Sequence, residues 1–269
     1  MDYAHGLFTW VDLSAPDPAA VKGFYESLFG WDSKDEFDPD GNYVYTSFSK
    51  DGLAVAGLGG QPPAMAGQGI PAIWNSYVTV DDVDATIDAW TGAGGSVLVP
   101  AMDVFTAGRM AFVVDPEGAV IALWQARDSV GGQIFNAPGA LSWNELNTRD
   151  VDAARDFYGK ALGWEFEIFE GDGPPYWLIT VPGKDQRAPF AEDAYNGGML
   201  TIGDQFPPEM PAHWSVYFLS ADVNADLAKL TGLGGNIVAP AMDTPAGRLA
   251  VASDPQGGAF NLIEPPQPS

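Results

Sequence analysis

The chain has 269 residues, with 36 Asp and Glu against 12 Lys and Arg, a formal net charge of −24 and no cysteine. So acidic a surface repels phosphate backbones and anionic lipids, and we expect neither nucleic acid nor membranes as partners. The lack of cysteine excludes disulfides, thiolate metal sites and cysteine nucleophiles. We see no signal-peptide pattern and no apolar run long enough to span a membrane, so we expect a cytoplasmic location.

Two segments of the chain recur. Trp10–Trp31 (WVDLSAPDPAAVKGFYESLFGW) returns 133 residues later as Trp143–Trp164 (WNELNTRDVDAARDFYGKALGW), and Thr91–Asp103 returns as Thr231–Asp243. Self-similarity of this kind indicates one structural unit used twice. A chain of this length accommodates two domains that each bury a core, and we place them at residues 1–133 and 134–269.

In the first half, the hydrophobic pattern predicts two rounds of a strand, a helix and three strands. Asp17 and Pro18 are typical of a helix start, and Gly30 of a helix end. A second helix is expected at Asp82–Gly92, with Val83, Ile87 and Trp90 on one face. The expected strands are His5–Leu13, Trp31–Phe37, Tyr43–Ser49, Leu53–Leu58, Trp74–Val80, Ser96–Val99, Arg109–Val114 and Ala119–Gln125.

The second half repeats this order. Asp150 is the expected cap of a third helix, and a fourth helix is expected at Asp222–Gly232. The expected strands are Leu141–Leu146, Trp164–Phe169, Tyr176–Val181, Tyr195–Ile202, His213–Leu219 and those around the turn Asp254–Gly257. The result is an α+β chain of four βαβββ modules. Two paired modules would curve their mixed sheets into a cup whose open face suits a small ligand.

The motifs FYESLFGW, FYGKALGW, VDPEGAV and SDPQGGA resemble the vicinal oxygen chelate superfamily, which includes glyoxalase I, extradiol dioxygenases and bleomycin-binding proteins. The resemblance covers nearly the whole chain and is strongest to a tandem-repeat branch of glyoxalase-like, loosely named hydroxylase, proteins. It implies two cupped domains. It does not imply one activity, because the superfamily uses the fold for several functions.

The resemblance also implies where a divalent metal would be bound. Its ligands stand seven residues before the helix-capping Asp of each module, and seven residues after the Asp of each Asp-Pro-x-Gly turn. These positions hold Trp10, Asn75 and Ala122 in the first half, and Trp143, Ser215 and Asn261 in the second. The remaining ligand, a Glu, has no acid to match it in Leu53–Gly60 or Tyr195–Ile202. Indole and methyl groups offer no lone pair to a cation, and Ser and Asn are weak ligands. We therefore predict no metal site and no cofactor.

Other side chains remain as candidates for chemistry. His213 stands two residues before Ser215 on one strand, so it could face the same cup as a general base, or it could hold the strand end through a structural hydrogen bond. His5 is expected to be structural or solvated. Arg109 with Asp103, and Arg248 with Asp243, would either form ion pairs at the rim or grip a substrate carboxylate or carbonyl.

Several aromatic residues occur in repeat-equivalent pairs. Tyr77 and Tyr217, like Trp74 and Trp214, would either pack in the core or contact a ligand. Trp10 and Trp143 differ, because the resemblance places them in the cup, where an indole suits stacking on a planar or cationic ligand.

We therefore expect metal-independent binding of a small planar or cationic molecule in two equivalent cups. The alternative is a glyoxalase-, lyase- or hydroxylase-type enzyme that works without the metal. Two points stay open. Module 1 pairs either with module 2, which places Trp10 near Asn75 and Ala122, or with module 4, which places it near Ser215 and Asn261. The chain is either a monomer with an internal pseudo-dimer or a homodimer.

Overall fold

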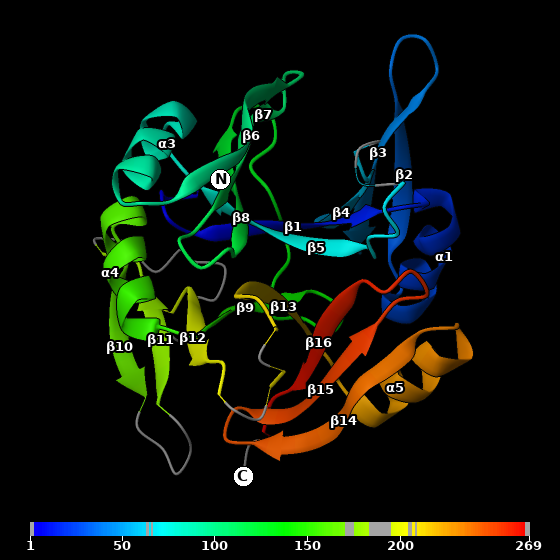
Figure 1. Ribbon diagram of the computed structural model, residues 1–269. Coiled ribbons are helices and arrows are strands. Elements are labelled where there is room, and N and C mark those ends of the chain that lie inside the picture. Colours follow the sequence, from blue (N-terminus) through cyan, green and yellow to red (C-terminus); the bar gives the residue numbers. More distant parts are fainter. Residues whose placement is uncertain are drawn as a thin grey trace. The chain divides into compact units, whose positions relative to one another are not determined.

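The structure, a computed structural model, describes residues 3–62, 65, 67–169, 175–182, 195–203, 206–207 and 209–266 (Figure 1). Its elements follow the predicted modular order. The first half contains β1 (Phe8–Ala15), α1 (Pro18–Phe29), β2 (Asp32–Phe37), β3 (Tyr43–Lys50), β4 (Leu53–Gly60), β5 (Ile73–Thr79), α3 (Val83–Gly92), β6 (Ser96–Val104), β7 (Gly108–Val114) and β8 (Val120–Ala126). The second half contains β9 (Leu141–Thr148), α4 (Val151–Leu162), β10 (Glu165–Phe169), β11 (Tyr176–Thr180), β12 (Gly197–Thr201), β13 (His213–Leu219), α5 (Val223–Gly232), β14 (Asn236–Thr244), β15 (Gly247–Ser253) and β16 (Ala259–Glu264).

Each of these four helices begins at an aspartate whose side chain accepts a backbone N–H three residues on. The carboxylate of Asp150, for example, accepts the N–H of Ala153 at 2.9 Å. Such a cap is worth about 1 kcal/mol. The predicted face of α3 needs a correction: Thr86 is buried with Val83 and Trp90, and Ile87 is partly exposed. The Thr86 hydroxyl can be buried because it donates to the carbonyl of Asp82 at 2.7 Å.

The strands form two eight-stranded mixed sheets, one from each repeat. Their orders are β2-β3-β4-β1-β5-β8-β7-β6 and β10-β11-β12-β9-β13-β16-β15-β14. In the sheets, therefore, module 1 is joined to module 2 and module 3 to module 4. β1 and β4 run parallel, with Asp12 opposite Gly57, and β9 and β12 run parallel, with Glu145 opposite Gly198.

The edge strand β6 is longer than the sequence suggested. The predicted strand Ser96–Val99 continues to Val104 and includes the Pro-Ala-Met-Asp motif. Its register with β7 shifts between Val99 and Met102, around Pro100, and β14 has the same irregularity around Pro240. An edge strand tolerates proline at a bulge, because the missing N–H has no ladder partner to lose.

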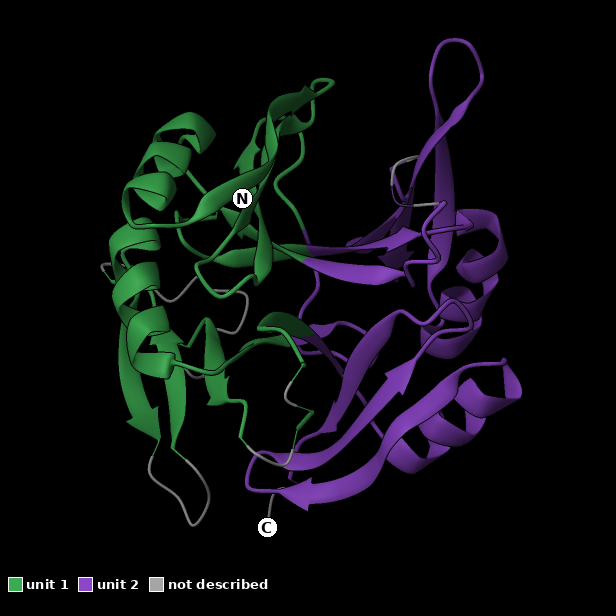
Figure 2. Cartoon of the chain, in the orientation of Figure 1, with its two compact units in different colours: residues 1–10, 76–131, 143–215 green, residues 11–75, 132–142, 216–269 purple. Residues whose placement is uncertain are grey.

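The chain divides into two compact units that each combine segments of both repeats (Figure 2). Unit 1 consists of residues 1–10, 76–131 and 143–215, and unit 2 of residues 11–75, 132–142 and 216–269. Within unit 1 helix α3 packs on α4, and within unit 2 helix α1 packs on α5. The core of each unit is thus shared between the repeats.

In unit 2 the Phe-Tyr and Gly-Trp residues of the first repeat form an aromatic core. Tyr25 stacks on Trp31 with ring centroids 5.9 Å apart, and the Trp31 indole N–H donates to the carbonyl of Gly139 at 2.9 Å. Gly139 has a φ of +78°, and a side-chain carbon added there would lie 3.0 Å from Phe29 Cβ, so the position requires glycine.

Unit 1 repeats this arrangement. Tyr158 stacks on Trp164 at 5.3 Å, and the Trp164 indole N–H donates to the carbonyl of Gly6 at 2.8 Å. Trp90 meets the edge of Phe157 at 4.7 Å. The repeated Phe-Tyr and Gly-Trp motif therefore serves the core, not a ligand site.

A buried hydrogen-bond chain links the sheet to a turn in each unit. In unit 2 Trp74 donates to the Tyr25 hydroxyl at 3.0 Å, which donates to Asp254 at 2.8 Å. In unit 1 Trp214 donates to Tyr158 at 3.0 Å, which donates to Asp115 at 3.0 Å. Burial raises the pKa of both aspartates, and raises the pKa of both tyrosines well above its usual range. Trp74 and Trp214 are thus core residues, and both tyrosines stay protonated.

Among the residues that the structure describes, no helix combines the length and the apolar character that a membrane crossing needs.

Candidate functional site

The six positions of the implied metal ligands lie on strands near the middle of each sheet: β1, β5 and β8 in the first, and β9, β13 and β16 in the second. Thr9 and Val11 on β1 are fully buried, so alternation directs Trp10, which is partly exposed, to the opposite face of the sheet. Asn75, Trp143 and Ser215 are also partly exposed, whereas Ala122 and Asn261 are buried.

In unit 2 a carboxylate lies at the centre of a polar cluster on this face. Asp12, 8% exposed, accepts the Tyr45 hydroxyl at 3.1 Å on one oxygen and the Asn75 amide at 2.8 Å on the other. The same amide nitrogen donates to Ser14 Oγ at 3.0 Å. We call Asp12, Ser14, Tyr45 and Asn75 the first polar cluster.

Unit 1 carries the equivalent group. Glu145, 8% exposed, accepts the Tyr176 hydroxyl at 2.8 Å, and the Trp143 indole N–H donates to the same hydroxyl at 2.9 Å. The Asn147 amide donates to Ser215 Oγ at 3.2 Å. We call Trp143, Glu145, Asn147, Tyr176 and Ser215 the second polar cluster.

The two clusters have two hydrogen bonds in common, one of them with exchanged side chains. Asp12 and Glu145 occupy the same position of the repeat, and each accepts a tyrosine hydroxyl. In the first cluster the amide is on β5 and the hydroxyl on β1, and in the second the amide is on β9 and the hydroxyl on β13. An amide and a hydroxyl remain complementary after this exchange.

A glycine on the neighbouring strand makes room for each tyrosine. A side-chain carbon added at Gly57 on β4 would overlap the Tyr45 hydroxyl, and one added at Gly198 on β12 would overlap that of Tyr176. These are the strands in which the superfamily pattern expects a Glu. The tyrosine hydroxyl therefore occupies the space that a side chain at position 57 or 198 would need.

The tyrosine of the second cluster acts as a hydrogen-bond donor. Burial, followed by the charge of Glu145, raises the pKa of Tyr176 well above its usual range. The phenol therefore stays protonated at neutral pH and donates its proton to the Glu145 carboxylate.

These residues do not fit the divalent metal that the superfamily pattern implies. The pattern's positions offer indoles, a methyl group, one hydroxyl and two carboxamides, and tyrosines fill the space beside the two glycines. Among the described residues, no group of three or more His, Asp or Glu side chains is placed to hold a metal ion.

The last-strand positions are packed. Ala122 pairs with Tyr77 across the parallel strands β5 and β8, and the Tyr77 ring meets the edges of Phe112 at 5.9 Å and Trp124 at 6.5 Å. In unit 2 Asn261 pairs with Tyr217, and its amide is 3.3 Å from the carbonyl of Val216. Both tyrosines are buried.

The two histidines each bind backbone. His213 Nδ1 lies 2.9 Å from the carbonyl of Pro211, at the start of β13. His5 Nδ1 accepts the N–H of Asp81 at 3.2 Å. A role for His213 as a base would leave only its Nε2 for the reaction.

The predicted arginine–aspartate pairs form. Arg109 binds Asp103 at 3.2 Å and is also held by both carboxylate oxygens of Asp84, each at 3.0 Å. Hydrogen bonds from Arg109 and Arg127 lower the pKa of Asp103. Arg248 binds Asp243 at 2.8 Å. Both pairs connect an edge strand to its neighbour. The two hydrogen bonds from Arg109 to Asp84 have the bidentate geometry with which Arg109 would otherwise bind a ligand carboxylate.

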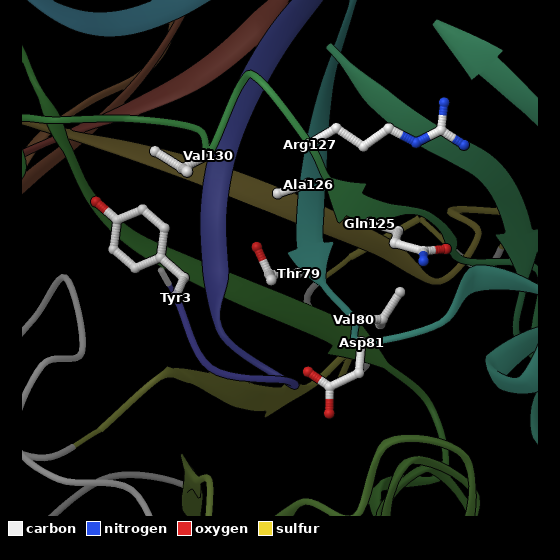
Figure 3. Close-up of a pocket in the computed structure, with 8 residues that line it drawn as sticks. All are labelled: Tyr3, Thr79, Val80, Asp81, Gln125, Ala126, Arg127 and Val130. Atoms are coloured by element: carbon white, nitrogen blue, oxygen red, sulfur yellow. The ribbon is translucent and has the colours of Figure 1, made fainter. Parts of the chain in front are cut away.

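A separate pocket of about 320 Å³ lies in unit 1 (Figure 3). Its lining is Tyr3, Thr79, Val80, Asp81, Gln125, Ala126, Arg127 and Val130. The guanidinium of Arg127 is bound by Asp103 at 2.9 Å. This pocket shares no residue with either polar cluster.

The sequence reading missed both carboxylates and both tyrosines of the clusters. The available signal was positional: Asp12 and Glu145 both follow the repeated tryptophan by two residues, which puts acid and indole on one face of a strand. The tyrosines had no such signal, because only the folded sheet brings β3 and β11 within side-chain reach of β1 and β9, across the intervening strands β4 and β12.

Known proteins share this architecture and sequence. The chain is 41% identical over 265 residues to "Putative glyoxylase CFP32" of Mycobacterium tuberculosis, covering 98% of this chain and 97% of the relative. It is 35% identical over 274 residues to the anthracycline biosynthesis protein DnrV of Streptomyces peucetius, covering 97% and 94%.

Among solved structures, the Mn(II)-bound glyoxalase from Novosphingobium aromaticivorans matches with a TM-score of 0.62 at 16% identity, over 97% of this chain and 82% of that one. The 2,3-dioxygenase LapB from Pseudomonas sp. KL28 matches with a TM-score of 0.61 at 14% identity, over 99% and 96%. These two likenesses show the fold. The family model of the Glyoxalase/Bleomycin resistance protein/Dioxygenase superfamily matches residues 7–123 and again 140–262. The chain therefore belongs to this superfamily and carries two tandem glyoxalase domains.

Proposed function

We propose that the protein binds a small planar or cationic organic molecule at two equivalent sites without a metal. The observation that carries the proposal is the second polar cluster, in which a partly exposed indole and a nearly buried carboxylate share one tyrosine hydroxyl. The first polar cluster repeats the carboxylate and the tyrosine, and Trp10 holds the repeat position of Trp143. Indoles suit stacking on planar ligands, and carboxylates suit cations.

The relatives favour the planar part of this proposal. One is named for anthracycline biosynthesis, and an anthracycline has a flat polycyclic aromatic body. A protein that holds such a molecule needs an aromatic platform more than a Lewis acid, and the implied ligand positions supply the platform.

Fluorescence titration tests the proposal. Planar aromatic probes, including an anthracycline, should quench tryptophan emission and saturate at two molecules per chain, and excess EDTA should not change the affinity. Trp10→Leu and Trp143→Leu should each remove one site. Trp177→Leu is the matched control, because Trp177 follows Tyr176 on β11 but stacks on the Arg155 guanidinium at 3.5 Å. Absence of binding by every probe would count against the proposal.

The second candidate is an enzyme that works without the superfamily's metal. The carboxylates of Asp12 and Glu145 favour it, because each is fixed by a tyrosine and could act as a base towards an acidic C–H bond. Turnover of a hemithioacetal that persists in EDTA and is lost in Glu145→Gln would support this candidate over simple binding.

The cytoplasmic location and the oligomeric state, monomer or homodimer, stay part of the proposal. Sedimentation velocity would decide the latter.

A further inference from the structure

We propose that the ligand of each polar cluster carries a cationic amine, which the carboxylate of Asp12 or Glu145 binds beside an aromatic ring. This inference rests on the proposed function and adds the chemical class of the ligand. It follows from how the hydrogen bonds within the clusters are directed.

In the second polar cluster the donors point inward. The Trp143 indole N–H is donated to Tyr176, the Tyr176 proton to Glu145, and the Asn147 amide to Ser215. With its only N–H donated to Tyr176, the Trp143 indole can meet a ligand through its ring rather than as a hydrogen-bond donor. A π face next to a carboxylate attracts a cation, and the charge of the carboxylate repels an anion.

The first polar cluster has the same polarity. The amide nitrogen of Asn75 makes two hydrogen bonds, to Asp12 and to Ser14, which uses both of its protons. The Tyr45 proton is donated to Asp12. The one charged group of this cluster is the Asp12 carboxylate, and a carboxylate binds most strongly to a cationic donor.

The charge of the whole chain supports this reading. A net charge of −24 concentrates cations around the protein and favours their association over that of anions. That field is not specific, however, so the local contribution of the two carboxylates has to be separated from it.

The experiment compares 9-aminoacridine, cationic at neutral pH, with acridine, a neutral molecule of nearly the same shape. Calorimetric titration of the full chain should give about tenfold tighter binding of the cation. The double variant Asp12→Asn, Glu145→Gln should lose that preference and keep its affinity for acridine. The matched control, Asp40→Asn with Asp156→Asn, removes the same charge from exposed positions and should keep the preference.

Equal affinity of the wild-type protein for both probes would overturn the inference and leave the proposed function standing. So would a preference that survives in the double variant with native near-UV circular dichroism. Should the double variant not fold, the single variants Asp12→Asn and Glu145→Gln should each lose the preference at one of the two sites, and a preference kept at both sites in both single variants would overturn the inference. Failure of both probes to bind would count against the inference and the proposed function together.

Discussion

Gly198 leaves the space in which Tyr176 of the second polar cluster packs. The Tyr176 hydroxyl occupies the space where a side chain at position 198 would begin. Gly198→Ala should therefore displace Tyr176 from Glu145 and Trp143 and destabilise the protein by about 1–3 kcal/mol in urea unfolding. Gly232→Ala, at the end of α5 with nothing within 4 Å, should be neutral or stabilising by up to about 1 kcal/mol. Equal stability of the two variants would contradict the packing described for Tyr176.

Asp254 is a residue whose burial gives a pH-dependent stability. It accepts the N–H groups of Gln256 at 2.7 Å and Gly258 at 2.9 Å, and burial still raises its pKa. A carboxyl whose pKa is higher in the folded state stabilises the fold fully below its unfolded pKa of about 4, and this contribution is lost as the pH rises through the folded pKa. Asp254→Asn lacks this titration. Relative to the variant, the wild type should thus lose unfolding free energy between about pH 4 and about pH 7. A relative gain of the wild type over this range would show the opposite shift.

At the scale of elements, one side chain fixes the turn between β7 and β8 to the start of α4. Glu117 accepts the Thr148 hydroxyl and the backbone N–H groups of Arg149 and Asp150. In unit 2 a glutamine, Gln256, makes the corresponding joint with the backbone of Asp17, accepting its N–H at 2.9 Å and donating to its carbonyl at 2.6 Å.

The repeat therefore predicts which substitution this joint tolerates. Glu117→Gln should retain most of the stability, because one amide oxygen suffices in unit 2. Glu117→Ala removes the acceptor of the buried Thr148 hydroxyl and of two exposed backbone N–H groups, and should cost about 1–3 kcal/mol in chemical unfolding. Equal losses in both variants would mean that the charge of Glu117, rather than its hydrogen bonds, holds α4.

At the scale of the whole molecule, the sequence predicted the four modules and their aspartate caps. It could not predict that unit 2 takes α1 from one repeat and α5 from the other. The hydrophobic effect is not directional, so the sequence around Phe29 does not indicate that its packing partner is Phe218. The polar clusters could not be predicted for a related reason. In the sequence, Asp12 and Glu145 look like ordinary polar residues of alternating strands, and only the folded sheet shows that each accepts a tyrosine hydroxyl.

The composition of unit 2 leads to a prediction about the isolated first repeat, residues 1–133. In the full chain Tyr25 is fully buried, and its hydroxyl binds Asp254, while Phe29 contacts Phe218 and Phe260. A fragment that lacks residues 134–269 exposes these rings. It therefore loses the burial of apolar surface that stabilises unit 2 in the full chain. It should bind the dye ANS or self-associate, and added fragment 134–269 should restore the near-UV circular dichroism of the full chain. A fragment that stays monomeric, excludes the dye and unfolds cooperatively would instead show that residues 1–133 form an independent domain.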